Sequence, residues 1–178
     1  MKKLICVLLA LTMLCALCAC GGGETPSGGD QPGGEPSQSQ SGGEQPTGYV
    51  FSYGGHTVAV DDDMADVLAA LGEPKSYFEA ESCAFNGLDK TYTYSGFIIT
   101  TRPDGDKDYV SSILLTDDSV TTPEGLYIGS SAEQVKAAYG ESESVMDTLL
   151  SYADANGHLL HFVLEQGKVI SIEYLAEG

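Results

Sequence analysis

The sequence predicts an α+β domain of two tandem helix-plus-three-strand-meander repeats, which form one antiparallel sheet with the helices on one face, after a disordered tether. Two phrases with the same helical pattern, 64–72 and 132–140, lie 68 positions apart. After each phrase the apolar period drops from about 3.6 residues to about 2, which indicates strands. Asn156-Gly157 is a strong hairpin signal between two of those strands. Helices followed by antiparallel strands are typical of α+β domains.

Residues 1–19 are expected to be an export signal peptide. Two lysines follow Met1, and an uncharged apolar run extends from residue 4 to residue 17. The alternative is a retained membrane helix. Such a helix needs about 20 apolar residues, and the glycine-rich stretch begins before that length is reached.

The segment Leu17-Cys18-Ala19-Cys20 resembles the bacterial lipobox. The resemblance implies that Cys20 is the lipidated first residue of the mature protein. Cys15 and Cys18 are poorer acceptors, because each follows a bulky leucine whereas Cys20 follows Ala19. A lipid-modified cysteine carries more than one acyl chain, which suffices for stable anchoring. We therefore expect a lipoprotein on the extracytoplasmic face of the cell membrane.

Residues 20–48 are expected to be the lipidated cysteine and a disordered tether. From residue 21 to residue 48 the chain contains only Gly, Ser, Thr, Pro, Gln, Glu and Asp. A stretch with no aliphatic or aromatic side chain has nothing to bury, so it stays disordered. Residues 49–178 are expected to form a single domain, with repeat one at 49–122 and repeat two at 123–178. About 60 residues alone bury too little apolar surface for a secure core.

Both predicted helices carry signals for their ends. The apolar stripe of the first helix consists of Met64, Val67, Leu68 and Leu71. An aspartate within 61–63 is expected to cap this helix, and Gly72 to end it. In the second helix, Ser130 and Glu133 fit a capping box, and Gly140 ends the helix.

The strand-like runs alternate apolar and polar residues between turn residues. They are 77–85, 91–101 (broken at Ser95-Gly96) and 109–116 in repeat one, and 147–153, 158–164 and 168–174 in repeat two. An extra strand at 49–53 leads into the domain through Gly54-Gly55. In the last run, Ile170, Ile172 and Tyr174 are expected to face the core.

The repeated sequence segments also resemble a known superfamily. The resemblance lies in Ile128-Gly129-Ser130-Ser131, Val135 and Tyr139-Gly140-Glu141, and in the matching residues of repeat one, Val67 and Leu71-Gly72-Glu73-Pro74. These segments are similar to the tandem repeat of the beta-lactamase-inhibitor-like superfamily, which includes small outer-membrane assembly lipoproteins of the SmpA/OmlA type. This resemblance implies the fold and protein partners, and it carries over no catalytic or contact residue. Segments 81–87 and 92–96 resemble uncharacterised lipoproteins of Gram-positive gut bacteria, which implies a Gram-positive cell surface.

No segment carries a recognisable catalytic or metal-binding motif. Acidic residues alternate in 104–108 as in an EF-hand loop, but Tyr109 and Leu115 stand where glycine and glutamate are needed. His158 and His161 are three apart on a predicted strand, so they point to opposite faces. We expect a non-enzymatic protein without metal or cofactor. The alternative is a small-ligand binder or hydrolase at the sheet surface.

Cys83 is the one cysteine that lies beyond residue 20, so the domain has no internal disulfide. It is either a buried small apolar residue or a reactive nucleophile. Nearby Glu79 and Glu81 oppose a thiolate, and free cysteine is among the most buried residue types. A buried Cys83 is therefore expected.

The domain is strongly acidic, since residues 49–178 hold 22 acidic and 6 basic side chains. This charge opposes direct binding to nucleic acid or to anionic lipid. The charge either serves solubility alone or favours a basic partner, which would be an envelope or host protein.

All ten tyrosines lie in the domain. Tyr92 and Tyr94 alternate along a predicted strand, so they share one face of the sheet. Aromatic residues suit strands, so these two are either sheet packing or part of a protein-binding face that the helices leave uncovered. We take Tyr92 and Tyr94, or their opposite-facing neighbours, as the candidate binding face.

Replacing Cys20 by serine tests the predicted anchor. In Cys20→Ser we expect lipid labelling to be lost, with release of the domain or accumulation of unprocessed precursor, because serine offers no thiol to the lipid. Metabolic labelling with a radioactive fatty acid and membrane fractionation measure both effects. Cys18→Ser is the matched control and should label normally. Labelling lost in Cys18→Ser but kept in Cys20→Ser would make Cys18 the acceptor.

Overall fold

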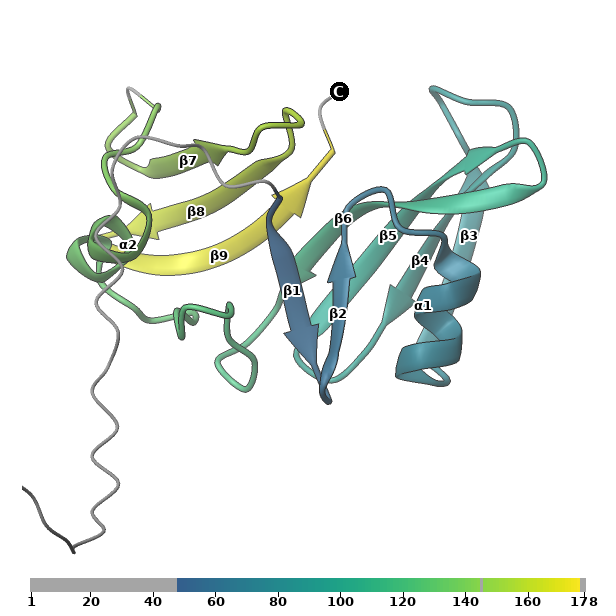
Figure 1. The fold of residues 1–178 in the computed structure, drawn as a ribbon, viewed down its shortest axis with the longest axis horizontal. Helices are drawn as coiled ribbons and strands as arrows, with labels where there is room; N and C mark the ends of the chain where they lie inside the picture. Colours follow the sequence, from purple (N-terminus) through teal and green to yellow (C-terminus); the bar gives the residue numbers. More distant parts are fainter. Residues whose placement is uncertain (1–47, 145, 177–178) are drawn as a thin grey trace, which may run out of the picture. The chain divides into compact units, whose positions relative to one another are not determined.

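The structure is a computed structural model that describes residues 48–144 and 146–176. The predicted signal peptide, Cys20 and the tether up to residue 47 lie outside the described residues. The described residues belong to the compact unit Ser41–Gly178. Its elements are β1 (Val50–Tyr53), β2 (His56–Ala59), α1 (Met64–Leu71), β3 (Ser76–Glu81), β4 (Leu88–Thr93), β5 (Phe97–Asp104), β6 (Lys107–Leu115), α2 (Ala132–Tyr139), β7 (Leu149–Ala153), β8 (Leu159–Glu165) and β9 (Lys168–Leu175) (Figure 1).

Seven strands form one antiparallel sheet in the order β3-β4-β5-β6-β9-β8-β7, and β1 and β2 pair separately as a hairpin. The predicted mixture of a large antiparallel sheet and two helices is confirmed. The strands before α2 meet the strands after it where β6 pairs with β9, from Ser112 opposite Leu175 to Leu115 opposite Ile172. This pairing turns two groups of strands into one sheet.

Both helices occupy the predicted segments, and their caps explain where they start. The Asp63 carboxylate accepts a hydrogen bond from Ala65 N at 3.0 Å and caps α1. The capping box of α2 pairs Ser131 with Gln134, one residue later than the predicted pair of Ser130 and Glu133. That prediction was therefore displaced by one position.

The predicted run 91–101 is a hairpin rather than a single strand. β4 ends at Thr93 and β5 begins at Phe97, with the turn at Ser95-Gly96. A Cβ on Gly96 would lie 2.5 Å from Ser119 Oγ, and the φ of Gly96 is +85°, so glycine is required there. The first group of strands therefore contains four members, β3 to β6, and the prediction of a three-strand meander there was wrong.

A bulge in β9 overturns one predicted core residue. Leu164 pairs with Val169 and the next pair is Val163 with Ser171, so Ile170 is an extra residue. The bulge reverses the in–out alternation, and the side chain of Ile170 is 49% exposed. The prediction that Ile170 faces the core was wrong. The same prediction is confirmed for the other two residues of that strand, Ile172 and Tyr174.

A second bulge lies in β6, where Ser111 is the extra residue. Beside it, the segment that leads into α1 is bonded to the strand. Asp61 N donates to Val110 O at 2.8 Å, and Val110 N donates to Asp62 O at 2.9 Å. Asp61 adopts a φ of +69°, a conformation that aspartate tolerates better than most residues. These bonds fix the start of α1 on β6.

The segment that leads into α2 is bonded to β9 in the same way. Gly129 N donates to Val169 O at 2.8 Å, and Val169 N donates to Ser130 O at 2.9 Å. Gly129 has a φ of +114°, which only glycine adopts without strain. Each helix therefore begins from a short backbone pairing beside the bulge of β6 or β9.

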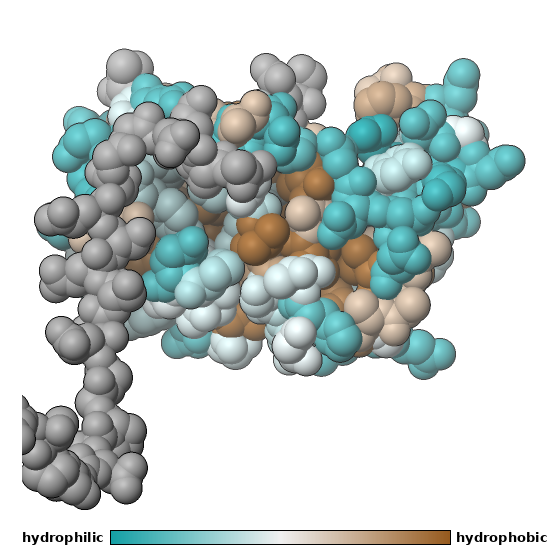
Figure 2. All heavy atoms as spheres, viewed as in Figure 1, coloured by the Kyte–Doolittle hydropathy of each residue, from teal (hydrophilic) through white to brown (hydrophobic). Residues whose placement is uncertain are grey.

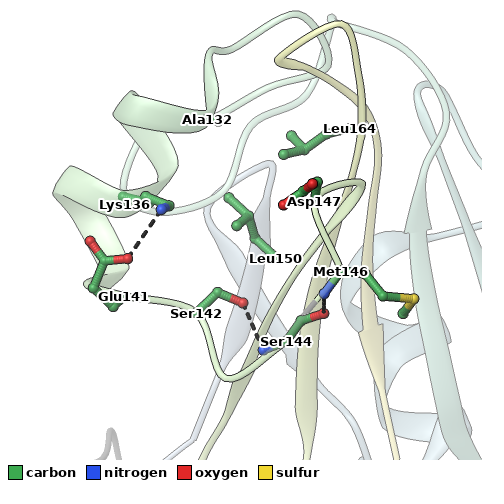
Figure 3. Close-up of a pocket in the computed structure, with 9 residues that line it drawn as sticks. All are labelled: Ala132, Lys136, Glu141, Ser142, Ser144, Met146, Asp147, Leu150 and Leu164. Carbon is green, nitrogen blue, oxygen red and sulfur yellow. Dashed lines mark hydrogen bonds and ion pairs between the residues drawn. The ribbon is translucent and has the colours of Figure 1, made fainter.

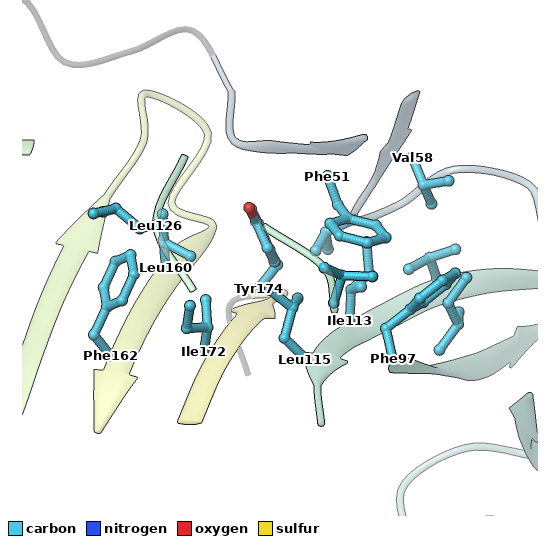
Figure 4. Close-up of a cluster of buried hydrophobic side chains, with 14 of the residues drawn as sticks. Phe51, Val58, Phe97, Ile113, Leu115, Leu126, Leu160, Phe162, Ile172 and Tyr174 are labelled. Atoms are coloured by element: carbon cyan, nitrogen blue, oxygen red, sulfur yellow. The ribbon is translucent and has the colours of Figure 1, made fainter. Parts of the chain in front are cut away.

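One face of the seven-stranded sheet carries the hydrophobic core (Figure 4). Phe51 of β1 lies at its centre. The Phe51 ring centroid is 4.8 Å from that of Phe97 in β5 and 6.2 Å from that of Tyr174 in β9. In α2, the Tyr139 ring lies 5.5 Å from Phe162 of β8. The hairpin and α2 therefore cover the same face of the sheet, and Phe51 contacts both groups of strands.

Seen from the side of α1 and the hairpin, the molecule is largely hydrophilic, with hydrophobic residues gathered near the middle of the view (Figure 2). α1 adds Met64 and Val67 to the same core cluster. Both helices and the hairpin thus form one layer over one face, and we call this the covered face.

Replacing Phe51 by alanine tests whether the core is shared. Deleting a fully buried phenylalanine side chain costs about 3–5 kcal/mol of unfolding free energy, and we expect Phe51→Ala to lose an amount in that range. Val50→Ala is the matched control: Val50 lies on the opposite side of β1 and is exposed, so its loss should be small. Both are measured by urea denaturation of the full chain. One cooperative transition is expected throughout, and two separate transitions would contradict a shared core.

Candidate functional site

Tyr92 and Tyr94 lie on the covered face, which corrects the expectation that they are presented to a partner. Their side chains are only 7% and 6% exposed. Tyr94 stacks on Phe97 at a centroid distance of 5.0 Å, and burial raises the pKa of both hydroxyls. The physical reason is the pairing with β5: Tyr92 stands opposite the fully buried Ile99, and Tyr94 lies on the same side of the sheet as Tyr92.

Tyr94 also closes the end of α1. Its hydroxyl donates to the carbonyl oxygen of Gly72, the residue after the helix, at 3.1 Å. Tyr152 of β7 makes the same bond to the oxygen of Gly140 after α2, also at 3.1 Å. Burial raises the pKa of Tyr152 to about 12. Each of these tyrosines therefore holds the C-terminal end of one helix on the sheet.

The opposite-facing neighbours of the tyrosines lie on the other face of the sheet, which we call the open face. Cross-strand partners share a face, so its residues follow from the pairing. One row contains Thr93, Ile98, Leu114, Glu173, His161 and Ser151. The next row contains Phe78, Thr91, Thr100, Ser112, Leu175, Leu159 and Ala153. All of these except exposed Phe78 are partly buried, so the face combines aliphatic and hydroxyl side chains.

A pocket of about 310 Å³ opens on this face beside the bulge in β6. Thr100, Ser112 and Leu175 of the open face line it, together with Ser111 of the bulge and Phe85 from the β3–β4 connection. Its charged residues are Asp89 and Arg102. The bulge separates Ser111 from the regular ladder and so creates an irregular surface at this point.

Arg102 is already neutralised. Its guanidinium donates to Asp61 Oδ1 at 2.9 Å and lies over the rings of Phe85 and Tyr109, at 5.9 Å and 5.5 Å from their centroids. Asp89 has no ion pair or side-chain hydrogen bond among the described residues, 48–144 and 146–176. The pocket therefore offers one carboxylate without an ion pair, among apolar and hydroxyl side chains.

Asp61, which pairs with Arg102 of this pocket, also lies beside His158 in the connection between β7 and β8. His158 Nε2 lies 3.1 Å from Asp61 Oδ2, and His158 Nδ1 lies 3.4 Å from Oδ2 of the buried Asp154. His161, by contrast, sits on the open face opposite Glu173. Within the residues that the structure describes, no three His, Cys, Asp or Glu side chains are placed to hold a metal ion.

The exposed aromatic side chains near the open face are phenylalanines that the sequence analysis did not select. Phe78 of β3 is 66% exposed, and Phe85 lines the pocket. The available signal was the alternation of Phe78 with Tyr77, which places one of the two rings on each face. Without the strand pairing, the alternation of Tyr77 and Phe78 does not tell which face of the sheet is covered.

Cys83 is exposed, so the expectation that it is buried was wrong. β3 ends at Glu81, and Cys83 lies in the connection to β4 rather than in a strand. Ser82 Oγ accepts hydrogen bonds from the backbone of Ala84 and Phe85, at 3.3 Å and 3.2 Å, and so shapes this loop. The thiol is therefore at the surface of a structured turn.

A second cavity of about 230 Å³ lies between α2 and the segment before β7 (Figure 3). Leu150 and Leu164 form its apolar wall, and Lys136 Nζ is paired with Glu141 Oε2 at 3.1 Å. Neither this cavity nor the pocket on the open face is lined by histidine or cysteine.

Comparisons of the chain with protein-family models, with curated proteins and with solved structures found no match. Among the described residues, no helix is long and apolar enough to span a membrane.

Tyr94→Phe tests the hydrogen bond between the Tyr94 hydroxyl and the end of α1. Removing the hydroxyl should lower the unfolding free energy by about 0.5–1.5 kcal/mol, because one hydrogen bond to Gly72 O is lost. Tyr92→Phe is the matched control, since no hydrogen bond of the Tyr92 hydroxyl is found within the described part of the chain, and it should change stability less. Thermal unfolding of the full chain measures both. Equal losses would show that the Tyr94 bond contributes nothing specific.

Proposed function

We propose that this chain is a membrane-anchored extracytoplasmic lipoprotein, held at Cys20, whose domain binds a basic envelope or host protein through the open face. The observation that carries the proposal is the asymmetry of the sheet. One face is buried under two helices and a hairpin, whereas the other presents partly buried aliphatic and hydroxyl side chains with a pocket among them. A face of this composition suits the apolar centre and polar rim of a protein interface.

The lining of the pocket favours one kind of partner side chain. Phe85 and Leu175 provide apolar walls, and Asp89 provides a carboxylate without a partner among the described residues. A lysine or arginine side chain fits this arrangement, because its aliphatic stem packs on apolar surface while its charged end meets the carboxylate. The excess of acidic residues in the domain attracts such a partner over a longer range.

We also propose that the domain consists of two tandem units, the arrangement that the superfamily resemblance implies. Three matched features support this: a bulge in β6 and in β9, a backbone pairing beside each bulge, and a tyrosine bonded to the residue after each helix. The sheet order, with β6 beside β9 at the centre, suits a two-fold relation between the units. β3 and the hairpin are the additions to the first unit.

The alternative is a small-ligand binder or hydrolase. The pocket on the open face favours it only by its volume, which lies at the lower end of the range for small-molecule sites, about 300–1,000 Å³. Its polar groups are hydroxyls, Asp89 and a neutralised arginine, which suit binding better than acid–base or nucleophilic chemistry.

Site-specific photocrosslinking in intact cells tests the proposed function. We expect the full chain to capture a basic protein from a photoreactive residue at Ser112, and not from one at Thr121, an exposed loop residue that lines neither pocket. Asp89→Lys should lower the yield about tenfold or more, because a like charge then meets the partner. Asp118→Lys makes the same charge change at an exposed position in the loop after β6 and is the control for charge alone.

Added salt should also lower the yield, mainly through slower association, because it screens the charges that guide the encounter. Equal capture from Thr121, or capture at Ser112 that neither Asp89→Lys nor salt reduces, would contradict the proposal.

A further inference from the structure

β3 leaves one edge of the seven-stranded sheet free. It is the first strand in the sheet order and pairs only with β4. Ser82 N donates to Gly87 O at 3.0 Å, and antiparallel bonding alternates from that pair along the strand. The backbone groups of Phe78 and Ala80 therefore face β4. Those of Tyr77, Glu79 and Glu81 point away from the sheet.

The opposite edge of the sheet is covered by the chain itself. Glu143 N donates to Ser151 O at 3.0 Å, and Ser151 N donates to Ser142 Oγ at 2.8 Å. The segment before β7 thus satisfies the backbone of β7 at Ser151. No such segment lies along β3 within the described residues. All six side chains of β3 are exposed, which holds for no other described strand.

The strand has only part of the usual protection of an edge. It contains no proline, lysine or bulge, and its charged side chains are Glu79 and Glu81. Two large aromatic side chains flank the edge, Tyr77 on the covered side and Phe78 on the open side. An added strand would pack against both rings.

The charge of the edge decides what can pair with it. Glu79 and Glu81 alternate with the open-face residues, so both carboxylates lie on the other side of β3. Lys90 stands opposite Glu79, but its Nζ is bonded to Asp108 Oδ2 at 2.6 Å. Glu79 accepts a hydrogen bond from the Tyr77 hydroxyl, which raises the pKa of that tyrosine. Neither glutamate has an ion pair in the part of the chain that is described.

A second copy of this chain fits the edge poorly when it pairs about a two-fold axis at Glu79. That antiparallel register would place the glutamate opposite its own copy, and like charges directly opposite each other are destabilising. An extended segment with lysine or arginine at every second position would instead meet Glu79 and Glu81 with opposite charges.

We propose that the free edge of β3 is a docking site for an extended, basic segment of a partner protein, which adds an eighth strand to the sheet. The backbone hydrogen bonds to Tyr77, Glu79 and Glu81 supply affinity, and the glutamates select basic side chains. This site is separate from the pocket on the open face, so either can fail without the other.

Amide hydrogen exchange of the full chain tests the proposal, with a capped heptapeptide of alternating lysine and threonine as the probe. At about ten times its Kd, the peptide should slow exchange of the Tyr77, Glu79 and Glu81 amides about tenfold. The Phe78 and Ala80 amides already face β4 and should change less. A peptide of alternating glutamate and threonine, and a lysine peptide methylated at every second backbone nitrogen, should have no effect.

Variants of the two glutamates separate edge pairing from charge alone. Glu79→Pro removes an outward N–H together with the carboxylate and leaves the bonds to β4 in place, whereas Glu79→Gln removes the carboxylate alone, so peptide protection should be lost in the first and only weakened in the second. The double variant Glu79→Lys with Glu81→Lys keeps the backbone intact and should bind the glutamate peptide instead of the lysine peptide. Asp89→Asn should change neither result.

The proposal is overturned if the lysine peptide leaves the three outward amides unprotected. It is equally overturned if the methylated peptide protects them as well as the unmodified one, or if the charge-reversed variant keeps its preference for lysine.

Discussion

The pairing of β6 with β9 is the contact on which the rest of the domain depends. It runs from Ser112 opposite Leu175 to Leu115 opposite Ile172 and joins the strands on either side of α2 into one sheet. Phe51 then packs across that junction, against Phe97 on one side and Tyr174 on the other. The long-range pairing and the hairpin above it therefore give the two groups of strands one continuous core.

The same junction divides the sheet into two faces with different tasks. The helices and the hairpin bury one face, and the backbone pairings beside the two bulges fix where each helix begins. The other face keeps aliphatic and hydroxyl side chains, with a pocket at the bulge of β6. The bulge of β6 therefore has two roles. It lies beside the backbone pairing that holds the start of α1, and it shapes the surface that we propose for binding.

The structure shows which of the acidic side chains are paired. In the sequence, the acidic charge favours solubility as readily as a basic partner. In the structure, Asp61 is engaged with Arg102 and His158, whereas Asp89 in the pocket and the glutamates of β3 have no ion pair among the described residues. Both proposed binding places thus carry carboxylates without an ion pair, as does much of the remaining described surface, and both proposals name a basic partner for that reason.

The sequence by itself determined the local features: both helices and their ends, most strands, the glycine turns and the antiparallel class, because capping, periodicity and turn chemistry act over a few residues. It left Tyr92 and Tyr94 open between sheet packing and a binding face, and it placed Cys83 and Ile170 wrongly. Alternation groups residues by face, but it does not say which face is covered, and one bulge reverses it, as at Ile170. Only the tertiary structure decided that Tyr94 closes α1, that Phe85 and Asp89 share a pocket, and that β3 is a free edge, because each depends on contacts between distant segments.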